Sequence, residues 1–111
     1  MEANEYQKLA LRTLNGELDK KNVLLNGVMG LCGESGEVID AVKKHLMHGH
    51  ELDRDHLIRE LGDVSWYLAI TAYALDCDLS EVFERNIAKL KARYPEGFSE
   101  ERSKHRAKND D

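Results

Sequence analysis

The sequence predicts an all-α fold, a helical bundle of about four helices, from its composition and from the spacing of its apolar residues. The chain has 111 residues, a size typical of one domain. Hydrophobic residues make up 41% of it, which suffices for a core, whereas aromatic residues make up only 6%. The single proline is Pro95, so a long proline-free run precedes it. Such a run with few aromatic residues favours helices over a β-sandwich or barrel.

Apolar residues recur at helical spacing in four segments, which predict helices over about residues 4–15, 22–48, 53–75 and 80–94. The Asn15-Gly16 pair reads as the turn after the first. Asp53 and Ser80 are placed to cap the third and fourth helices, and Pro95 ends the fourth.

Residues 1–98 are expected to form the folded domain and residues 99–111 a charged tail. Eight of the thirteen tail residues are charged and only Ala107 is apolar. A segment this polar cannot bury enough surface to order itself alone.

Net charge and motifs exclude several classes of function. The net charge of −5 argues against a nucleic-acid polymer as partner, because such binders are normally basic. No apolar run is long enough for a membrane helix, and the N-terminal residues lack the pattern of a signal peptide, so we expect a cytoplasmic protein. Two cysteines, Cys32 and Cys77, are too few for a disulfide framework.

Four glycines recur every third residue in the second helix: Gly27, Gly30, Gly33 and Gly36. Each costs roughly 1 kcal/mol relative to alanine inside a helix, so tertiary packing or a ligand must hold the segment. Either the glycines let another helix or a ligand approach the backbone closely, or the helix is broken or kinked near Gly27–Gly30.

A short internal repeat is the most informative feature of the sequence. Residues 31–42 and 57–68 share the pattern L-x-x-E-x-G-[ED]-V, which aligns Glu34 with Glu60 and Glu37 with Asp63. In a helix, both members of each pair lie side by side at the margin of the apolar stripe. The repeat therefore predicts an acidic site between the second and third helices.

Four carboxylates at close range repel one another, and nothing in the local sequence supplies four matching basic residues. A hard divalent cation such as Mg²⁺ or Mn²⁺ would resolve the conflict, and Mg²⁺ also bridges to phosphates. The alternative is four ordinary surface acids on amphipathic helices.

The E-x-x-E…E-x-x-D pattern resembles that of the all-α nucleoside triphosphate pyrophosphohydrolases, and most closely their MazG-like group. Segments 42–50 and 86–103 are similar to that group as well. The resemblance implies a helical homodimer or homotetramer that hydrolyses (d)NTP to (d)NMP and pyrophosphate in nucleotide-pool housecleaning. It further implies that Mg²⁺, or Mn²⁺ in its place, is held by Glu34, Glu37, Glu60 and Asp63, with Glu37 favoured to activate the water.

Basic and amide side chains are candidates for binding the triphosphate: Lys44, Asn86, Lys89 and Arg93. The last three share one face of the fourth helix. The alternative for the charged ones is a solvated basic face with ion pairs. Trp66 and Tyr94 could stack on a base, but packing in a core or interface is the favoured interpretation.

Rival functions remain open. His45, His48 and His50 could bind zinc, although exposed histidines at a helix end are the better interpretation because no fourth ligand is fixed nearby. Phosphoribosyl-ATP pyrophosphohydrolases are similar in size and acidic motif. A non-catalytic helical oligomerisation or regulatory module is the alternative of another class, whereas a di-iron bundle would show Glu-x-x-His pairs.

Overall fold

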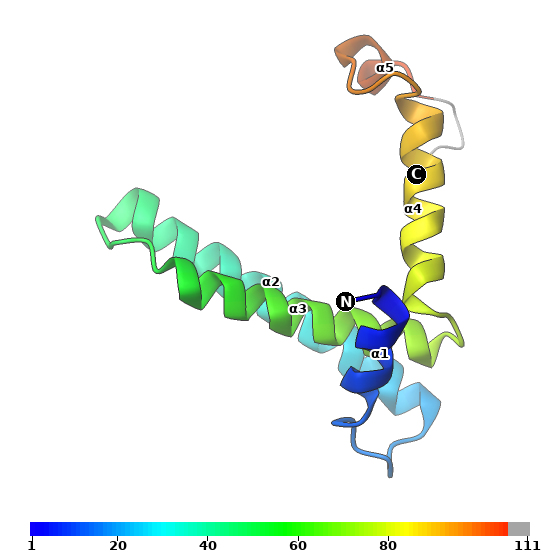
Figure 1. The fold of residues 1–111 in the computed structure, drawn as a ribbon. Coiled ribbons are helices and arrows are strands. Elements are labelled where there is room, and N and C mark those ends of the chain that lie inside the picture. The colour runs from blue at the N-terminus through cyan, green and yellow to red at the C-terminus, as the bar shows by residue number, and fades with distance from the viewer. Residues whose placement is uncertain (107–111) are drawn as a thin grey trace. The chain divides into compact units, whose positions relative to one another are not determined.

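The computed structural model describes residues 1–106, and the helices found there are α1 (Ala3–Leu11), α2 (Lys20–His48), α3 (Arg54–Ala74), α4 (Leu79–Arg93) and α5 (Glu100–Lys104). The all-α prediction is confirmed, with four helices of substantial length (Figure 1). The chain divides into two compact units after Leu79, and each is described by itself. Within the described residues, no helix is both long and apolar enough to cross a membrane.

Helices α2 and α3 form an antiparallel pair joined by a short loop (Figure 1). The Asp19 carboxylate caps α2 by accepting a hydrogen bond of 2.9 Å from the Asn22 N–H. Gly49, with φ of 72°, ends α2 in the left-handed conformation that glycine adopts without strain. Asp53 then caps α3 by accepting from the His56 N–H at 3.0 Å, as the sequence predicted.

Two glycines of α2, Gly27 and Gly30, lie in close contact with a neighbouring helix. An added Cβ at Gly27 would overlap the Thr71 hydroxyl, and one at Gly30 would overlap the Tyr67 ring. The predicted close approach of another helix is therefore confirmed at these two positions, and that helix is α3. The alternative of a break is wrong, because α2 is continuous from Lys20 to His48.

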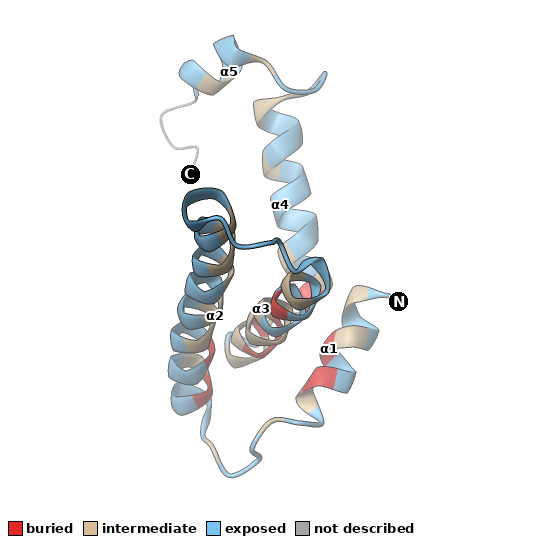
Figure 2. Cartoon of the chain, turned by 90° about the vertical axis from the view of Figure 1, so that its left-hand side faces the viewer, coloured by how far each residue is buried: buried red, intermediate tan, exposed pale blue. Residues whose placement is uncertain are grey.

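The buried side chain of Gln7 links helix α1 to the end of α3 through hydrogen bonds. Gln7 is 6% exposed, and its Nε2 donates to the Ala69 and Cys77 carbonyls at 3.1 Å each. Its Oε1 accepts from the Leu79 N–H at 2.9 Å. Around this amide, Ala10, Ala69 and Leu79 form the buried apolar core of the first unit, and Figure 2 shows the buried segments of α1 and α3.

The predicted boundaries shift at two helices. Helix α1 ends at Leu11, short of residue 15, and turn residues follow it. Helix α4 begins at Leu79, so the prediction that Ser80 caps it is wrong and Ser80 lies in the first turn. The reason is the Gln7 side chain, which accepts a hydrogen bond from the Leu79 N–H at the helix start.

In the second unit, α4 leaves most of its apolar face uncovered. Phe83, Ile87 and Leu90 are 45%, 50% and 39% exposed at helical spacing. After α4, Ser99 caps the five-residue helix α5, none of whose residues is buried. The charged-tail prediction also covers residues 107–111, among them Ala107, which lie outside the described residues, and the boundary at residue 98 stays a prediction.

Candidate functional site

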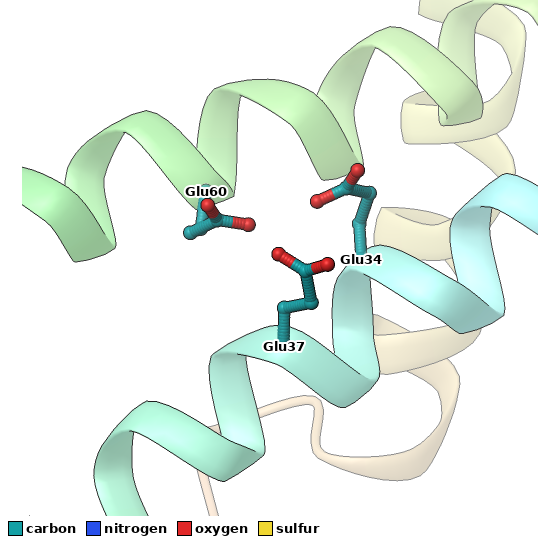
Figure 3. Close-up of side chains that lie close together, drawn as sticks. All are labelled: Glu34, Glu37 and Glu60. Atoms are coloured by element: carbon teal, nitrogen blue, oxygen red, sulfur yellow. The ribbon is translucent and has the colours of Figure 1, made fainter.

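Three carboxylates meet where α2 and α3 lie side by side. Oxygen atoms of Glu34, Glu37 and Glu60 all lie within 4.8 Å of one another (Figure 3). The first two are one helical turn apart on α2, and the third faces them from α3. The structure thus confirms an acidic cluster between the second and third helices.

Glu60 is the buried member of this cluster, at 8% exposure. The Nε2 atom of His56, one turn earlier on α3, lies 3.7 Å from its Oε1 atom. Its Oε2 atom is fully shielded from solvent and receives no hydrogen bond from a donor group. A buried carboxylate oxygen without a donor is costly, so this atom favours a cationic partner.

The neighbouring carboxylates change the pKa of Glu34. Its pKa is raised, first by hydrogen bonding with the Glu60 carboxyl. Partial loss of solvation and the negative charges of Glu37, Glu60 and Asp63 raise the pKa further. The repulsion predicted from the repeat is therefore present in the cluster.

Asp63 lies beside the cluster rather than within it. Its carboxylate is near enough to Glu34 to raise that group's pKa, and it also raises the pKa of Tyr6, although burial is the larger cause there. With Glu34, Trp66 and Tyr67, it lines a hollow of about 360 Å³. The structure therefore gathers three of the four predicted ligands and places the fourth next to Glu34.

Lys44 lies on the other side of the cluster, toward the loop between α2 and α3. Its Nζ atom is 3.0 Å from the Asp40 carboxylate, and this contact lowers the pKa of Asp40. Lys44 also lines a hollow of about 400 Å³ together with Glu37, His50 and His56. The predicted phosphate-binding lysine is thus close to one residue of the cluster.

The other predicted phosphate-binding residues, Asn86, Lys89 and Arg93, lie on α4 in the second unit. Asn86 is exposed, and the two basic residues are partly buried. Their role toward a triphosphate stays a prediction.

The histidine cluster is not supported as a zinc site. Nδ1 of His45 contacts the carbonyl oxygen of His50 at 2.8 Å. Within residues 1–106, the group of three or more potential metal ligands that lie together is the carboxylate cluster. Sequence reasoning missed His56 and Tyr67, although His56 carries a signal because it stands four residues before Glu60 on a helix.

Comparison with known proteins adds evidence from outside the structure. Residues 25–98 match the MazG nucleotide pyrophosphohydrolase domain, a range that contains all four acids of the repeat. The chain is also 43% identical over 86 residues to the Gene 37 protein of Mycobacterium phage L5, which covers 74% of this chain and 75% of the phage protein. No solved structure matches the chain.

Proposed function

Because the chain belongs to the MazG nucleotide pyrophosphohydrolase family, we propose that it hydrolyses a nucleoside triphosphate, ribo- or deoxyribo-, to the monophosphate and pyrophosphate. The reaction uses Mg²⁺, for which Mn²⁺ can substitute, and serves nucleotide-pool housecleaning. The observation that carries the proposal is the cluster of Glu34, Glu37 and Glu60 around a carboxylate oxygen that lacks a donor.

The residues of the cluster suit a hard divalent cation. All the ligand atoms are oxygens, which Mg²⁺ prefers, and its bonds of about 2.1 Å place two ligands of one ion up to about 4.2 Å apart. The carboxylate oxygens here lie within 4.8 Å of one another, so small side-chain movements suffice. The buried Oε2 atom of Glu60 would gain the partner that it lacks.

In this proposal the three carboxylates of the cluster hold the cation, and Asp63 completes the set from beside Glu34. Bound Mg²⁺ would neutralise charge on the phosphates and lower the pKa of a coordinated water. Glu37 is the exposed carboxylate of the cluster, and its role is to accept the proton of the attacking water. The water attacks the α-phosphorus, the bond to the bridging oxygen breaks, and pyrophosphate leaves.

Binding of the phosphate chain is assigned to basic and amide side chains: Lys44, Asn86, Lys89 and Arg93. Lys44 contacts Asp40 in the free protein and lies beside the same hollow as Glu37. A triphosphate would offer this ammonium group a stronger anionic partner than Asp40 alone.

The test is an assay of purified protein with ribo- and deoxyribonucleoside triphosphates, and with phosphoribosyl-ATP as a rival substrate, in Mg²⁺. Monophosphate and pyrophosphate should appear, and isotopically labelled water should place its oxygen in the monophosphate. Glu37→Gln should abolish turnover, whereas the matched control Glu17→Gln, at an exposed site on the α1–α2 connection, should not. Orthophosphate as product would refute the bond selectivity, and no turnover on any substrate would favour the non-catalytic module.

We also propose that the chain assembles as a homodimer or homotetramer. Within residues 1–106, sixteen large hydrophobic side chains are exposed, whereas only six hydrophobic residues are buried. Uncovered apolar area of this extent is typical of protein interfaces. Light scattering after size-exclusion chromatography should give a multiple of 12.7 kDa, and a monomer would refute the proposal. We place the reaction in the cytoplasm, where nucleotide pools are and where the thiols of Cys32 and Cys77 would stay reduced.

A further inference from the structure

We propose that His56 is a positioning residue, which donates a hydrogen bond to one oxygen of Glu60 and so presents the other oxygen to the divalent cation. This inference rests on the proposed function, because it concerns how one carboxylate of the cluster is oriented for that cation. It assigns to the cation site a side chain that does not itself bind the metal.

The two carboxylate oxygens of Glu60 have different surroundings. The Nε2 atom of His56 lies 3.7 Å from Oε1, whereas Oε2 is shielded from solvent and receives no hydrogen bond. Glu34 and Glu37 face this carboxylate from α2 (Figure 3). When one oxygen of a carboxylate binds a metal, the rest of the group is normally hydrogen-bonded to the protein. The surroundings of Glu60 match that division, with a donor on the Oε1 side and an open position on the Oε2 side.

The geometry of α3 directs Glu60 toward His56. The two residues stand four positions apart, a spacing at which side chains on a helix are neighbours. The Cα–Cβ bonds of a helix tilt toward its N-terminus, so the Glu60 side chain leans back toward His56. A separation of 3.7 Å is longer than a hydrogen bond, and we expect it to shorten when a cation orders the carboxylate.

The backbone at His56 is fixed before any ligand arrives. Asp53 caps α3, and its carboxylate accepts a hydrogen bond of 3.0 Å from the His56 N–H. The Asp53 carbonyl oxygen also accepts from the Leu57 N–H at 3.1 Å. The first turn of α3 therefore holds the imidazole at a set height relative to Glu60.

The alternative role for His56 is to bind the substrate, since it lines the hollow of about 400 Å³ together with Lys44 and Glu37. The structure favours positioning, because Nε2 already faces Glu60 without a ligand. Positioning requires only the N–H of a neutral imidazole, whereas a positive charge beside a bound cation would be unfavourable. The two roles differ in one measurable property, which is the affinity of the nucleotide-free protein for the metal.

The experiment measures Mn²⁺ binding to the full-length protein without nucleotide, by the electron paramagnetic resonance signal of the free ion. His56→Leu keeps an apolar side chain of moderate size but removes the donor. It should weaken Mn²⁺ binding about ten-fold, the loss typical when the partner of a metal ligand is removed. Displacement of Mn²⁺ by Mg²⁺ should show the same loss for Mg²⁺.

Two amide variants test the position of the donor. The amide nitrogen of glutamine reaches about as far as Nε2 of histidine, whereas that of asparagine reaches only as far as Nδ1. His56→Gln should therefore bind Mn²⁺ like the original protein, and His56→Asn should bind as weakly as His56→Leu.

Two controls separate positioning from a general effect on the fold. His48→Leu changes an exposed histidine of α2 outside the hollow and should leave Mn²⁺ binding unchanged. The His56 side chain is 43% exposed, so urea unfolding without metal should give similar midpoints for all the variants.

Unchanged Mn²⁺ affinity in His56→Leu would overturn the proposal, even if hydrolysis slows, because His56 would then act on the substrate. Equal Mn²⁺ affinity in His56→Gln and His56→Asn would also overturn it, and this comparison decides the matter if His56→Leu does not fold. If Mn²⁺ affinity follows the donor at residue 56 but no nucleotide is hydrolysed, the proposed function alone is refuted.

Discussion

Replacing Gly30 by alanine should destabilise the protein, although alanine is the better helix former. The added methyl group would overlap the Tyr67 ring, which cannot swing away freely because it stands against Trp66. Gly33→Ala makes the same chemical change three residues later in α2, where nothing lies within 4 Å of the new atom. The two variants therefore differ in the contact with α3 and in little else.

The expected size follows from two opposing effects. Alanine in place of glycine inside a helix stabilises it by about 1 kcal/mol, and Gly33→Ala should show the whole gain. Forcing an extra methyl group into a filled space costs about 1–3 kcal/mol. Several Tyr67 ring atoms lie inside the contact distance, so we take the upper value for Gly30→Ala. Its net loss is about 2 kcal/mol, which leaves about 3 kcal/mol between the two variants.

Urea unfolding followed by circular dichroism measures this difference, at one fixed protein concentration because assembly would alter the apparent stability. Gly62→Ala, on α3 and also in open space, is a second control and should resemble Gly33→Ala. If Gly30→Ala is as stable as the controls, close packing of Tyr67 on α2 does not explain the glycine. The orientation of the Tyr67 ring against α2 would then need another explanation.

The remaining predictions concern Mg²⁺ binding, the pH dependence of stability and the hydrogen bonds that Gln7 makes from α1. Saturating Mg²⁺ at about one hundred times its dissociation constant should stabilise the protein by about 2.7 kcal/mol; thermal unfolding should show this gain lost in Glu60→Gln and kept in Glu84→Gln, and a gain kept in both would contradict the ligand assignment. The pKa of Glu34 is raised in the folded state, so the folded protein binds more protons than the unfolded chain just above the ordinary carboxyl pKa. Without Mg²⁺, stability should therefore fall as the pH rises through that window, and Glu34→Gln should flatten the curve measured by urea unfolding at several pH values. Gln7→Met should cost about 3 kcal/mol in the same assay, about 1 kcal/mol for each of three lost hydrogen bonds, and a loss below about 1 kcal/mol would show that α1 is held by apolar contacts instead.

The carboxylate cluster could be predicted from the sequence because it depends on local periodicity. Glu34 and Glu37 share a helix face at any tertiary arrangement, and the repeat placed a matching pair on a second helix. The offset of Asp63 could not be predicted in this way. Whether Glu60 or Asp63 points inward depends on the rotation of α3 about its axis, which packing against both α1 and α2 determines.

Long-range contacts account for the other differences. The start of α4 depends on Gln7, a residue 72 positions earlier, so no local capping rule could place it. The glycine spacing predicted that something approaches α2, but only the structure shows that Tyr67 is the neighbour at Gly30. The hollow was missed for the same reason, because its aromatic lining is oriented by contacts from two other helices.

The hydrogen bonds from Trp66 to Ala10 and Thr13 tie the indole to the last turn of α1 and to the residues just after it. Native proteins open locally, and a short terminal helix held by few interactions opens more readily than the rest. Each such opening releases the indole. The fraction of molecules in which Trp66 is held in place therefore depends on the local opening equilibrium of residues 3–11. Ligands that need the fixed indole must then slow amide hydrogen exchange in α1, a helix whose residues do not line the hollow beside Trp66.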